Sequence, residues 1–283
     1  MTEIKAYAKI NPFLDIISKR PDGYHDIKSY MQTVDFYDTV TLEICDGDFI
    51  SVIGMPEVEE TKNLAYKAAV AFFNKTGIPA GLKIFIDKRI PSEAGLGGGS
   101  SDAAAVIRGL NEIFETNLSN EELIEMAKSV GSDVPFLVFG GSKLVSGRGE
   151  IIEDAPIFPD CYIVIAKGGD GAKTAEQYAK LDEIYSEFAS RDDSNVYFDS
   201  LMKAIKNKDF PEIGNNLYNI FEYTAGVDEN IKNIMRFCGA SGAMLSGSGS
   251  ACFGIFIDQK DATRACDILK NYGYKAVITQ PKR

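Results

Sequence analysis

The sequence predicts an α+β fold in two domains, on three observations. Some stretches alternate polar and apolar residues as strands do, others carry apolar residues at helical spacing, and the composition changes near the middle of the chain. A chain of 283 residues with 45% hydrophobic residues is long enough to build two cores. The segment EDAPIFPD, with its two prolines, marks the change and divides a first domain, residues 1–155, from a second, residues 156–283.

The first domain is expected to begin with a strand in residues 6–17, an apolar stretch that contains Lys9 and Asn11. The turn-forming sequence PDG follows it. Two more strands are expected where polar and apolar residues alternate, at residues 38–45 and 82–90. Helices are expected at residues 63–77, from Ser100 or Ser101 to Phe114, and from a capping box at Ser119 and Glu122 to Gly131, and residues 134–141 form a short buried apolar run.

The second domain is expected to start with a core strand, CYIVIAKGG. Helices should follow at residues 199–207 and 226–238. A glycine- and serine-rich loop then leads into a strand, and an amphipathic helix at residues 261–273 precedes a last strand, YKAVIT. Strands and helices are thus expected in both halves of the chain.

The charge balance excludes several classes of partner. The formal charge is −11, from 30 basic and 41 acidic residues, and no basic stripe runs along the chain. A protein that binds nucleic acid or an anionic membrane surface normally shows a basic excess, so we expect neither partner. An anionic ligand would need a local site that works against the overall field.

Cysteine and histidine usage limits the chemistry further. The five cysteines are odd in number and scattered, without a C-x-x-C pair, which indicates reduced thiols rather than disulfides or a zinc site. His25 is the only histidine, so histidine-rich metal sites are excluded. The first residues lack the apolar core of a signal peptide, and no apolar run reaches the length of a membrane span. We therefore expect a cytoplasmic protein, as a monomer or a weak homodimer.

The most informative stretch is IPSEAGLGGGSSDAAA, residues 90–105, which connects a predicted strand to a predicted helix. Gly95 and Gly97 to Gly99 let the backbone turn sharply and approach a ligand closely, and the helix start offers unpaired N–H groups and a positive dipole end to phosphate. Ser100 and Ser101 can cap the helix or bind phosphate or Mg²⁺. The stretch matches neither the Walker A pattern nor G-x-G-x-x-G. The alternative is a turn that only lets strand and helix pack.

A second glycine-rich stretch, LSGSGSACF, spans residues 245–253. Alone it is equally compatible with an ordinary flexible turn. Together with the first loop it gains meaning, because a triphosphate is long enough to contact two such loops. Together the two loops therefore predict a nucleoside triphosphate as ligand.

Phosphoryl transfer needs positioning, charge neutralisation and a group that accepts the proton of the attacking hydroxyl. Lys9 and Asp133 are the candidates. Lys9 lies in an otherwise apolar strand, where the alternative is an edge lysine that reaches solvent. Asp133 precedes Val134-Pro135, where the alternative is an N-cap aspartate. A neighbouring lysine favours an ionised carboxylate, which could then accept a proton from an alcohol.

Tyr24 and His25 form an exposed-looking aromatic pair after the PDG turn. A surface tyrosine beside a solvated histidine is the more frequent explanation of such a pair. The functional alternative is recognition of a nucleobase, with the tyrosine ring stacked on the base and the histidine bonded to its edge.

These three motifs resemble those of the GHMP kinase family: AKINPFLDIISKRPDGYH, IPSEAGLGGGSSDAAA and LSGSGSACF. The resemblance covers nearly the whole chain, in order and at the family's spacing. It implies an N-terminal domain with the ribosomal-protein-S5-like fold, a ferredoxin-like C-terminal domain, and an active site between them. The D-G-Y-H segment is similar to that of members whose substrate is cytidyl-diphospho-methylerythritol. The implied reaction moves the γ-phosphate of ATP, with Mg²⁺, to the 2-hydroxyl of that substrate.

The resemblance also implies roles for individual residues. Lys9 and Asp133 would be the catalytic pair. The ATP-binding residues would be Asn63, Lys88, Pro91, Gly95, Leu96, Gly97, Gly98, Gly99, Ser100 and Ser101. The substrate-binding residues would be Asn11, Tyr24, His25, Tyr178, Gly247, Ser248 and Gly249, with Tyr178 against the base. Tyr178 lies in AKGGDGAKTAEQY, a loose match to the family's segment, and Pro12 replaces a leucine that is frequent after K-I-N.

Three other functions fit part of the sequence. A kinase of the same family that acts on mevalonate or homoserine would not need the Tyr24–His25 pair. A nucleotide-binding regulatory protein without catalysis would not need both Lys9 and Asp133. An RNA-binding module, suggested by the S5-like topology, conflicts with a net charge of −11.

Overall fold

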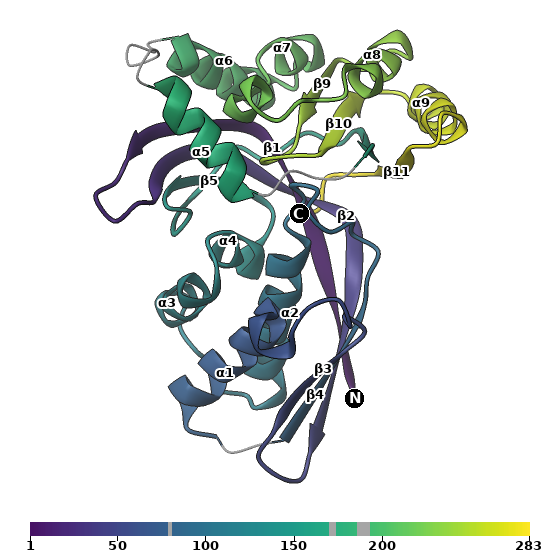
Figure 1. Cartoon of the computed structure of the whole chain (residues 1–283). Helices are drawn as coiled ribbons and strands as arrows, with labels where there is room; N and C mark the ends of the chain where they lie inside the picture. The colour runs from purple at the N-terminus through teal and green to yellow at the C-terminus, as the bar shows by residue number, and fades with distance from the viewer. Residues whose placement is uncertain (79–80, 170–173, 186–192) are drawn as a thin grey trace.

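The computed structural model describes residues 1–78, 81–169, 174–185 and 193–283. Its strands form two sheets, one in the lower and one in the upper part of Figure 1. The lower sheet has seven strands with the central order β3-β4-β2-β1-β8, and the upper sheet has four. Both parts contain strands and helices, so the predicted α+β class is confirmed.

A long antiparallel hairpin forms the backbone of the lower sheet. Its strands are β1 (Thr2–Lys19) and β2 (His25–Cys45), paired from Thr2 opposite Leu42 to Lys19 opposite His25. The predicted strands at residues 6–17 and 38–45 are only parts of these two, because both continue past the segments that alternate most clearly. The pairing shifts register between Tyr7 and Lys9, an irregularity that re-aims side chains and is frequent beside active sites.

The remaining strands of this sheet join the hairpin on either side. β4 (Gly81–Asp87) pairs with the second half of β2, and β5 (Ser142–Gly147) with its first half. β3 (Ile50–Ile53) and β6 (Ile151–Asp154) extend these edges, and β8 (Tyr218–Asn219) pairs in parallel with β1. The hairpin therefore connects elements from both halves of the chain.

Four helices cover one face of the lower sheet (Figure 1): α1 (Leu64–Thr76), α2 (Gly98–Ile113), α3 (Asn120–Val130) and α4 (Val134–Phe139). The predicted capping box of Ser119 and Glu122 is present at the start of α3. The apolar run 134–141 is a short helix, with Pro135 in its first turn. The small side chains of Ala103 to Ala105 are fully buried, so that α2 packs closely on the sheet.

The upper part has the order of a ferredoxin-like fold. Its strands are β7 (Tyr162–Lys167), β9 (Gly242–Leu245), β10 (Ala251–Phe256) and β11 (Lys275–Thr279). They lie antiparallel in the order β11-β7-β10-β9, so the fourth strand pairs with the first, and the first with the third. The helices are α5 (Thr174–Tyr185), α6 (Asp193–Asn207), α7 (Phe210–Asn215), α8 (Glu229–Phe237) and α9 (Gln259–Asn271), and two 3₁₀ turns lie at Glu60–Lys62 and Ile220–Tyr223.

The two parts are closely joined. The predicted domain boundary at 155/156 lies between β6 and β7, but β8 returns to the lower sheet, and Val34 forms a β-bridge with Pro281 near the C-terminus. Helix α5 crosses the end of the β1–β2 hairpin (Figure 1). None of the helices in the described ranges has the length and apolar character needed to span a bilayer.

Candidate active site

A cleft of about 860 Å³ lies where the hairpin, the loop before α2, the start of α4 and helix α5 meet. Clefts of this size are typical of sites for small molecules. All the residues predicted for the site line it except Asn63, Ser101 and Gly249. The lining members are Lys9, Asn11, Tyr24, His25, Lys88, Pro91, Gly95, Leu96, Gly97, Gly98, Gly99, Ser100, Asp133, Tyr178, Gly247 and Ser248. Residues far apart in the sequence are thus brought together here.

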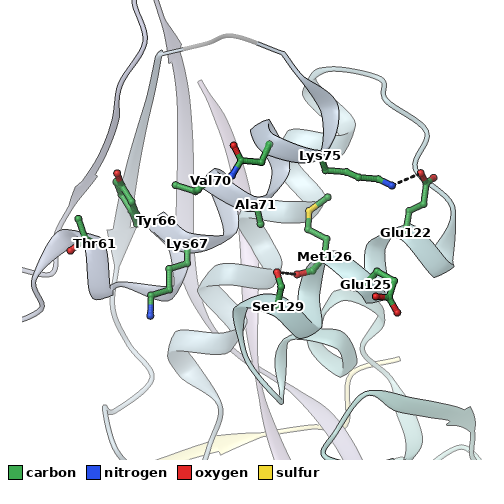
Figure 2. A pocket seen from close by; sticks show the side chains of 11 residues that line it. Thr61, Tyr66, Lys67, Val70, Ala71, Lys75, Glu122, Glu125, Met126 and Ser129 are labelled. Carbon is green, nitrogen blue, oxygen red and sulfur yellow. Dashed lines mark hydrogen bonds and ion pairs between the residues drawn. The ribbon is translucent and has the colours of Figure 1, made fainter.

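A second cavity, of about 640 Å³, lies between α1 and α3 (Figure 2). It is lined mainly by apolar groups such as Val70 and Met126, and none of the predicted site residues belongs to it. Lys75 of α1 and Glu122 of α3 form an ion pair of 3.0 Å that joins the two helices. The chemistry-bearing side chains therefore gather in the larger cleft.

The two glycine-rich loops pack directly against each other. Ser246 Oγ donates to the Gly95 carbonyl at 3.1 Å, and Ala251 N donates to the Ala94 carbonyl at 3.1 Å. A Cβ on Gly95 would lie 1.9 Å from the Ser246 carbonyl oxygen, and the φ of Gly95 is +74°. Gly95 is therefore required for contact between the loops, a reason that the sequence alone did not reveal.

Helix α2 begins inside the cleft. It starts at Gly98 rather than at Ser100 or Ser101, since Gly97, with φ +72°, is its N-cap and no side chain caps it. The first hydrogen bond of the helix runs from Ser101 N to the Gly97 carbonyl, which leaves the amides of Gly98, Gly99 and Ser100 without an acceptor within the helix. These amides, at the positive end of a helix of 16 residues, form an anion-binding surface.

The two serines after the glycines have different environments. Ser100 lines the cleft. The Ser101 side chain is buried, and its hydroxyl donates to the Tyr7 carbonyl at 2.6 Å, so it ties α2 to β1. The Ser101 hydroxyl was predicted to cap the helix or to bind phosphate or Mg²⁺, whereas in the structure it donates to the Tyr7 carbonyl.

Lys9 and Asp133 meet at the centre of the cleft. Lys9 Nζ lies 3.7 Å from Asp133 Oδ2, and the two side chains are 4% and 30% exposed. The backbone N–H of Lys9 donates to the Leu96 carbonyl at 3.0 Å, which fixes β1 to the glycine loop. Asp133 occupies the N-cap position of α4, but its side chain makes no cap hydrogen bond. Its carboxylate therefore remains available to the cleft, and Lys9 is no edge lysine that reaches solvent.

Asn11 holds the Lys9 side chain in place. Its Oδ1 accepts from Lys9 Nζ at 2.6 Å and from Gly247 N at 3.1 Å. Its Nδ2 donates to Ser29 Oγ at 2.9 Å, and Ser29 Oγ donates to the Phe13 carbonyl. The amide of Asn11 is thus engaged by the protein itself, and it connects the lysine to the second glycine loop.

Lys88 lies between two carboxylates that the sequence did not predict for the site. Its Nζ lies 2.9 Å from Asp102 Oδ2 and also forms an ion pair with Asp38. Asp38 Oδ1 additionally accepts from Arg89 N and Ile90 N, at the entrance to the glycine loop. Burial raises the pKa of Asp102 to about 7 despite the nearby ammonium, and its Oδ1 has no hydrogen-bond partner among the described residues. Lys88 follows the end of β4 and Asp102 lies in α2, 14 positions further on, so no periodic pattern in the sequence indicated this contact.

The far wall of the cleft is aromatic. Tyr24 is 50% exposed, with the Arg148 guanidinium 3.4 Å above its ring. The His25 side chain is only 9% exposed, so the prediction of an exposed pair was wrong for the histidine. Its ring stacks on Tyr178 at 4.8 Å between centroids, and Tyr178 meets Phe221 edge-on at 5.0 Å. Helix α5 packs over the histidine ring, and the sequence pattern predicted no helix at these residues.

Asp182, one turn beyond Tyr178 on α5, is a further residue that sequence reasoning missed. Its Oδ1 lies 2.7 Å from His25 Nε2, and its Oδ2 accepts from Lys19 Nζ at 2.6 Å. Burial opposes ionisation, but the hydrogen bonds from Lys19 and His25 outweigh it, so the pKa of Asp182 lies below its usual value. The spacing of four residues between Tyr178 and Asp182 on one helix face was the signal available in the sequence.

Three predicted residues lie outside the lining of the cleft. Asn63 is the N-cap of α1, where its side chain accepts from Ala65 N at 2.9 Å. The Ser101 hydroxyl is bonded to Tyr7 of β1. Gly249 has a φ of +89° in the second glycine loop, and a Cβ there would meet Leu245. Residues 170–173, part of the loosely matched segment around Tyr178, lie outside the described residues.

The residues that the structure describes contain no group of three histidine, cysteine, aspartate or glutamate side chains that could hold a metal ion. Ser248, at the tip of the second loop, shares a hydrogen bond of 2.9 Å with Thr174 of α5. This contact links α5 to the second glycine loop.

Comparisons with known proteins identify the family of this chain. The model of the GHMP kinases N-terminal domain matches residues 63–141, and the model of the GHMP kinases C-terminal region matches residues 201–275. A 4-diphosphocytidyl-2-C-methyl-D-erythritol kinase of Caldicellulosiruptor saccharolyticus is 42% identical over 283 residues, which cover 98% of this chain and 95% of that protein.

Solved structures give the same result. The crystal structure of a 4-(cytidine 5'-diphospho)-2C-methyl-D-erythritol kinase superposes with a TM-score of 0.77 at 27% identity and covers all of both chains. The mevalonate kinase of L. major, in complex with R-mevalonate, has a TM-score of 0.76 at 19% identity, covering 100% of this chain and 97% of that one. At that identity the second likeness shows a common fold and nothing about the substrate.

Proposed function

The chain belongs to the GHMP kinase family and, within it, to the 4-diphosphocytidyl-2-C-methyl-D-erythritol kinases, and from this we propose that it transfers the γ-phosphate of ATP to the 2-hydroxyl of 4-diphosphocytidyl-2-C-methyl-D-erythritol. The products are the 2-phosphate and ADP, in non-mevalonate isoprenoid precursor biosynthesis. The observation that carries the proposal is one cleft that joins an anion-binding helix start, the Lys9–Asp133 pair and an aromatic wall.

Asp133 acts as the general base of this reaction. Its carboxylate takes the proton of the 2-hydroxyl as the oxygen forms a bond to the γ-phosphorus and the bond to ADP breaks. Lys9, 3.7 Å away, neutralises charge that develops on the attacking oxygen and the transferred phosphoryl group. Asn11 keeps the lysine side chain extended toward this position through its 2.6 Å hydrogen bond.

The triphosphate binds at the start of α2. The amides of Gly98, Gly99 and Ser100 donate to phosphate oxygens, and the helix dipole adds attraction. Ser100 lines the cleft, whereas the Ser101 hydroxyl donates to the Tyr7 carbonyl, so Ser100 is the loop serine whose hydroxyl can serve Mg²⁺. Mg²⁺ prefers oxygen ligands, usually keeps several waters and is held largely by substrate phosphates, which fits a site with few protein carboxylates. When bound, the ion neutralises phosphate charge.

The base of the acceptor lies against the aromatic wall. Tyr24, His25 and Tyr178 line that end of the cleft and offer ring faces for stacking and a nitrogen for hydrogen bonding. Mevalonate and homoserine have no base to place there, which favours a nucleotide-bearing acceptor over theirs.

A coupled assay of ADP release tests the proposal. Purified protein would receive ATP and Mg²⁺ with the cytidyl-diphospho substrate, with mevalonate, with homoserine, or with no acceptor. We expect ADP release with the cytidyl substrate at least about 100-fold faster than in the other three reactions, because only that acceptor fills both ends of the cleft. Equal rates with and without acceptor, or a preference for mevalonate or homoserine, would overturn it.

A further inference from the structure

Asp182 makes the only carboxylate contact to His25 among the hydrogen bonds of the described residues. We infer that Asp182 is a positioning residue that fixes the hydrogen-bonding face of His25 and so makes the site select a base with an exocyclic amino group, cytosine, over one with a carbonyl in its place, uracil. This inference rests on the proposed function, since it concerns the base of the same acceptor. Asp182 itself acts through His25.

Both oxygens of Asp182 are occupied, each by one strand of the hairpin. Oδ1 lies 2.7 Å from His25 Nε2 and Oδ2 accepts from Lys19 Nζ at 2.6 Å. Lys19 and His25 are the paired residues at the end of β1 and β2. The carboxylate therefore spans the hairpin end, and because it lies on α5 it holds helix and hairpin together over the cleft.

The carboxylate determines which nitrogen of His25 carries the proton. The hydrogen bonds to Asp182 hold its pKa below the usual value against the effect of burial, so at neutral pH it is ionised and can only accept. His25 Nε2 must then be the donor. In the neutral imidazole the other nitrogen, Nδ1, carries no proton and is an acceptor.

The ring cannot easily turn to present its other edge. It stacks on Tyr178 at 4.8 Å with an interplanar angle of 29°, and Tyr178 is itself fixed by Phe221. His25 lines the cleft, and none of the hydrogen bonds between described residues engages its Nδ1. The position thus offers one acceptor, held in a fixed direction, to whatever base enters.

An acceptor in this place distinguishes the two pyrimidines. The 4-amino group of cytosine donates to Nδ1, whereas the 4-carbonyl of uracil directs a lone pair at it. Sites that hydrogen-bond a particular polar group reject analogues that leave a buried polar atom unpaired far more strongly than apolar pockets reject a missing methylene. The discrimination depends on Asp182, because the opposite tautomer of His25 would favour uracil.

Kinetics with two acceptors test the inference. The measurement is kcat/KM for the cytidyl-diphospho and uridyl-diphospho forms of the methylerythritol substrate, with ATP saturating. We expect the native protein to prefer the cytidyl form about 100-fold, and Asp182→Asn to reduce this preference below about 10-fold, chiefly through KM. The side-chain amide of the variant can donate to Nε2 as well as accept from it. His25 is then no longer held in the Nε2–H tautomer. The KM for ATP should change less than about twofold.

Glu176→Gln is the matched control. Glu176 is an exposed carboxylate on the same helix and is not among the lining residues of the cleft. The Glu176→Gln variant should prefer the cytidyl acceptor over the uridyl acceptor as strongly as the native protein does. An equal loss of preference in both variants would mean that α5 responds to any lost charge, and it would overturn the inference.

Nuclear magnetic resonance reads the tautomer directly, without turnover. His25 is the only histidine of the chain, so its ring nitrogens need no assignment after labelling with ¹⁵N-histidine. We expect the Nε2–H form in the native protein at pH 8, and a mixture or the Nδ1–H form in Asp182→Asn. An Nδ1–H form in the native protein, or an unchanged acceptor preference in the variant, would overturn the inference. A native protein that phosphorylates neither acceptor would instead overturn the proposed function, and the spectrum would still report on Asp182.

Discussion

Two lysines line the same cleft, one buried and one half-buried, and they differ in how their charge is balanced. Lys9 has one carboxylate, at 3.7 Å and partly exposed, together with the neutral amide of Asn11. Lys88 lies between two buried carboxylates, Asp38 and Asp102. A cation that is short of counter-charge attracts an incoming anion, whereas a cation that already has two carboxylates has little attraction left.

A further lysine, buried and outside the cleft, supports this distinction. Lys232 has ion pairs of 2.9 Å with Glu222 and 2.8 Å with Glu229, and its side chain is 4% exposed, as is that of Lys9. Burial alone therefore does not identify a catalytic lysine. The useful criterion is the balance of charge around it, which points to Lys9 for phosphoryl transfer and to Lys88 for holding the entrance of the glycine loop.

The largest effect is expected from Asp133→Asn, which removes the carboxylate beside Lys9. The kcat of the proposed reaction should fall by about 10²- to 10⁴-fold, because an amide cannot accept the hydroxyl proton, while the KM for ATP should change little. Steady-state ADP release measures both constants. Asp102→Asn, which removes a carboxylate beside Lys88, should lower kcat less than about tenfold. Similar kcat values for the two variants would remove the distinction between the lysines.

The second effect concerns stability. Lys88→Met would leave Asp38 and Asp102 buried together without a cation, which should lower the free energy of unfolding by about 3–5 kcal/mol. Lys9→Met should change it by less than about 1 kcal/mol, because the carboxylate that it leaves, Asp133, is partly exposed. Urea unfolding followed by circular dichroism compares the two. A destabilisation that is larger for Lys9→Met would contradict the assignment of roles.

The surroundings of the two lysines also show where prediction from sequence succeeds and where it fails. Lys9 was predictable because a lysine in an apolar strand is unusual. The loop at Gly97 to Gly99 was predictable because a run of three glycines is unusual. The fold class followed from periodicity and from the family resemblance. Asp38 and Asp102 could not be placed, since their contact with Lys88 depends on β2, β4 and α2 meeting in three dimensions. Aspartates in such positions are usually exposed, and no periodic pattern distinguishes a buried one.

The aromatic wall also shows what local sequence predicts and what it does not. Tyr24 and His25 follow a turn, so an exposed pair was the expectation from local sequence. The burial of His25 comes from α5, more than 150 positions away, whose Tyr178 and Asp182 cover the ring. Local sequence thus identified which residues could contact a base, but only tertiary packing determines which edge of the histidine they leave available.

A smaller effect concerns pH and the cluster of Lys88. Burial raises the pKa of Asp102 from 3.8 to about 7, so between these values the folded protein holds a proton that the unfolded chain has released. Stability contributed by this group is therefore present at low pH and is lost as pH rises toward about 7. Asp102→Asn lacks this titration, so its stability relative to the native protein should increase by about 2 kcal/mol from pH 5 to pH 7 and level off toward pH 8.

Urea unfolding of both proteins at pH 5, 6, 7 and 8 measures this difference, and the other titrating groups cancel in the comparison. A difference that does not vary with pH would mean that Lys88 keeps Asp102 ionised throughout. The lysine would then be as strongly bound at pH 5 as at pH 8, and the two ion pairs of the cluster would be equivalent.

The smallest effect is expected from adding one methyl group beside each lysine. A Cβ on Gly247 would lie 3.0 Å from Lys9 Nζ and 2.8 Å from the Gly95 carbonyl oxygen, and the φ of Gly247 is +53°. A Cβ on Gly98 would lie 3.1 Å from Lys88 Nζ, at a helical position where alanine is favoured over glycine. Gly247→Ala should therefore lower kcat about tenfold by displacing Lys9 from Asp133, and Gly98→Ala should change kcat less than about threefold.

The two glycine variants differ in which constant they affect. Gly98 contributes an amide to the anion-binding surface, so its added methyl group should act on the KM for ATP, by hindering close approach of phosphate. Gly247 lies beside the reacting groups and should act on kcat. Initial rates over a matrix of ATP and acceptor concentrations separate these constants. A loss of kcat in Gly98→Ala as large as that in Gly247→Ala would show that Lys88, despite its two carboxylates, takes part in the chemical step, and the comparison between the two lysines would then fail at its most sensitive point.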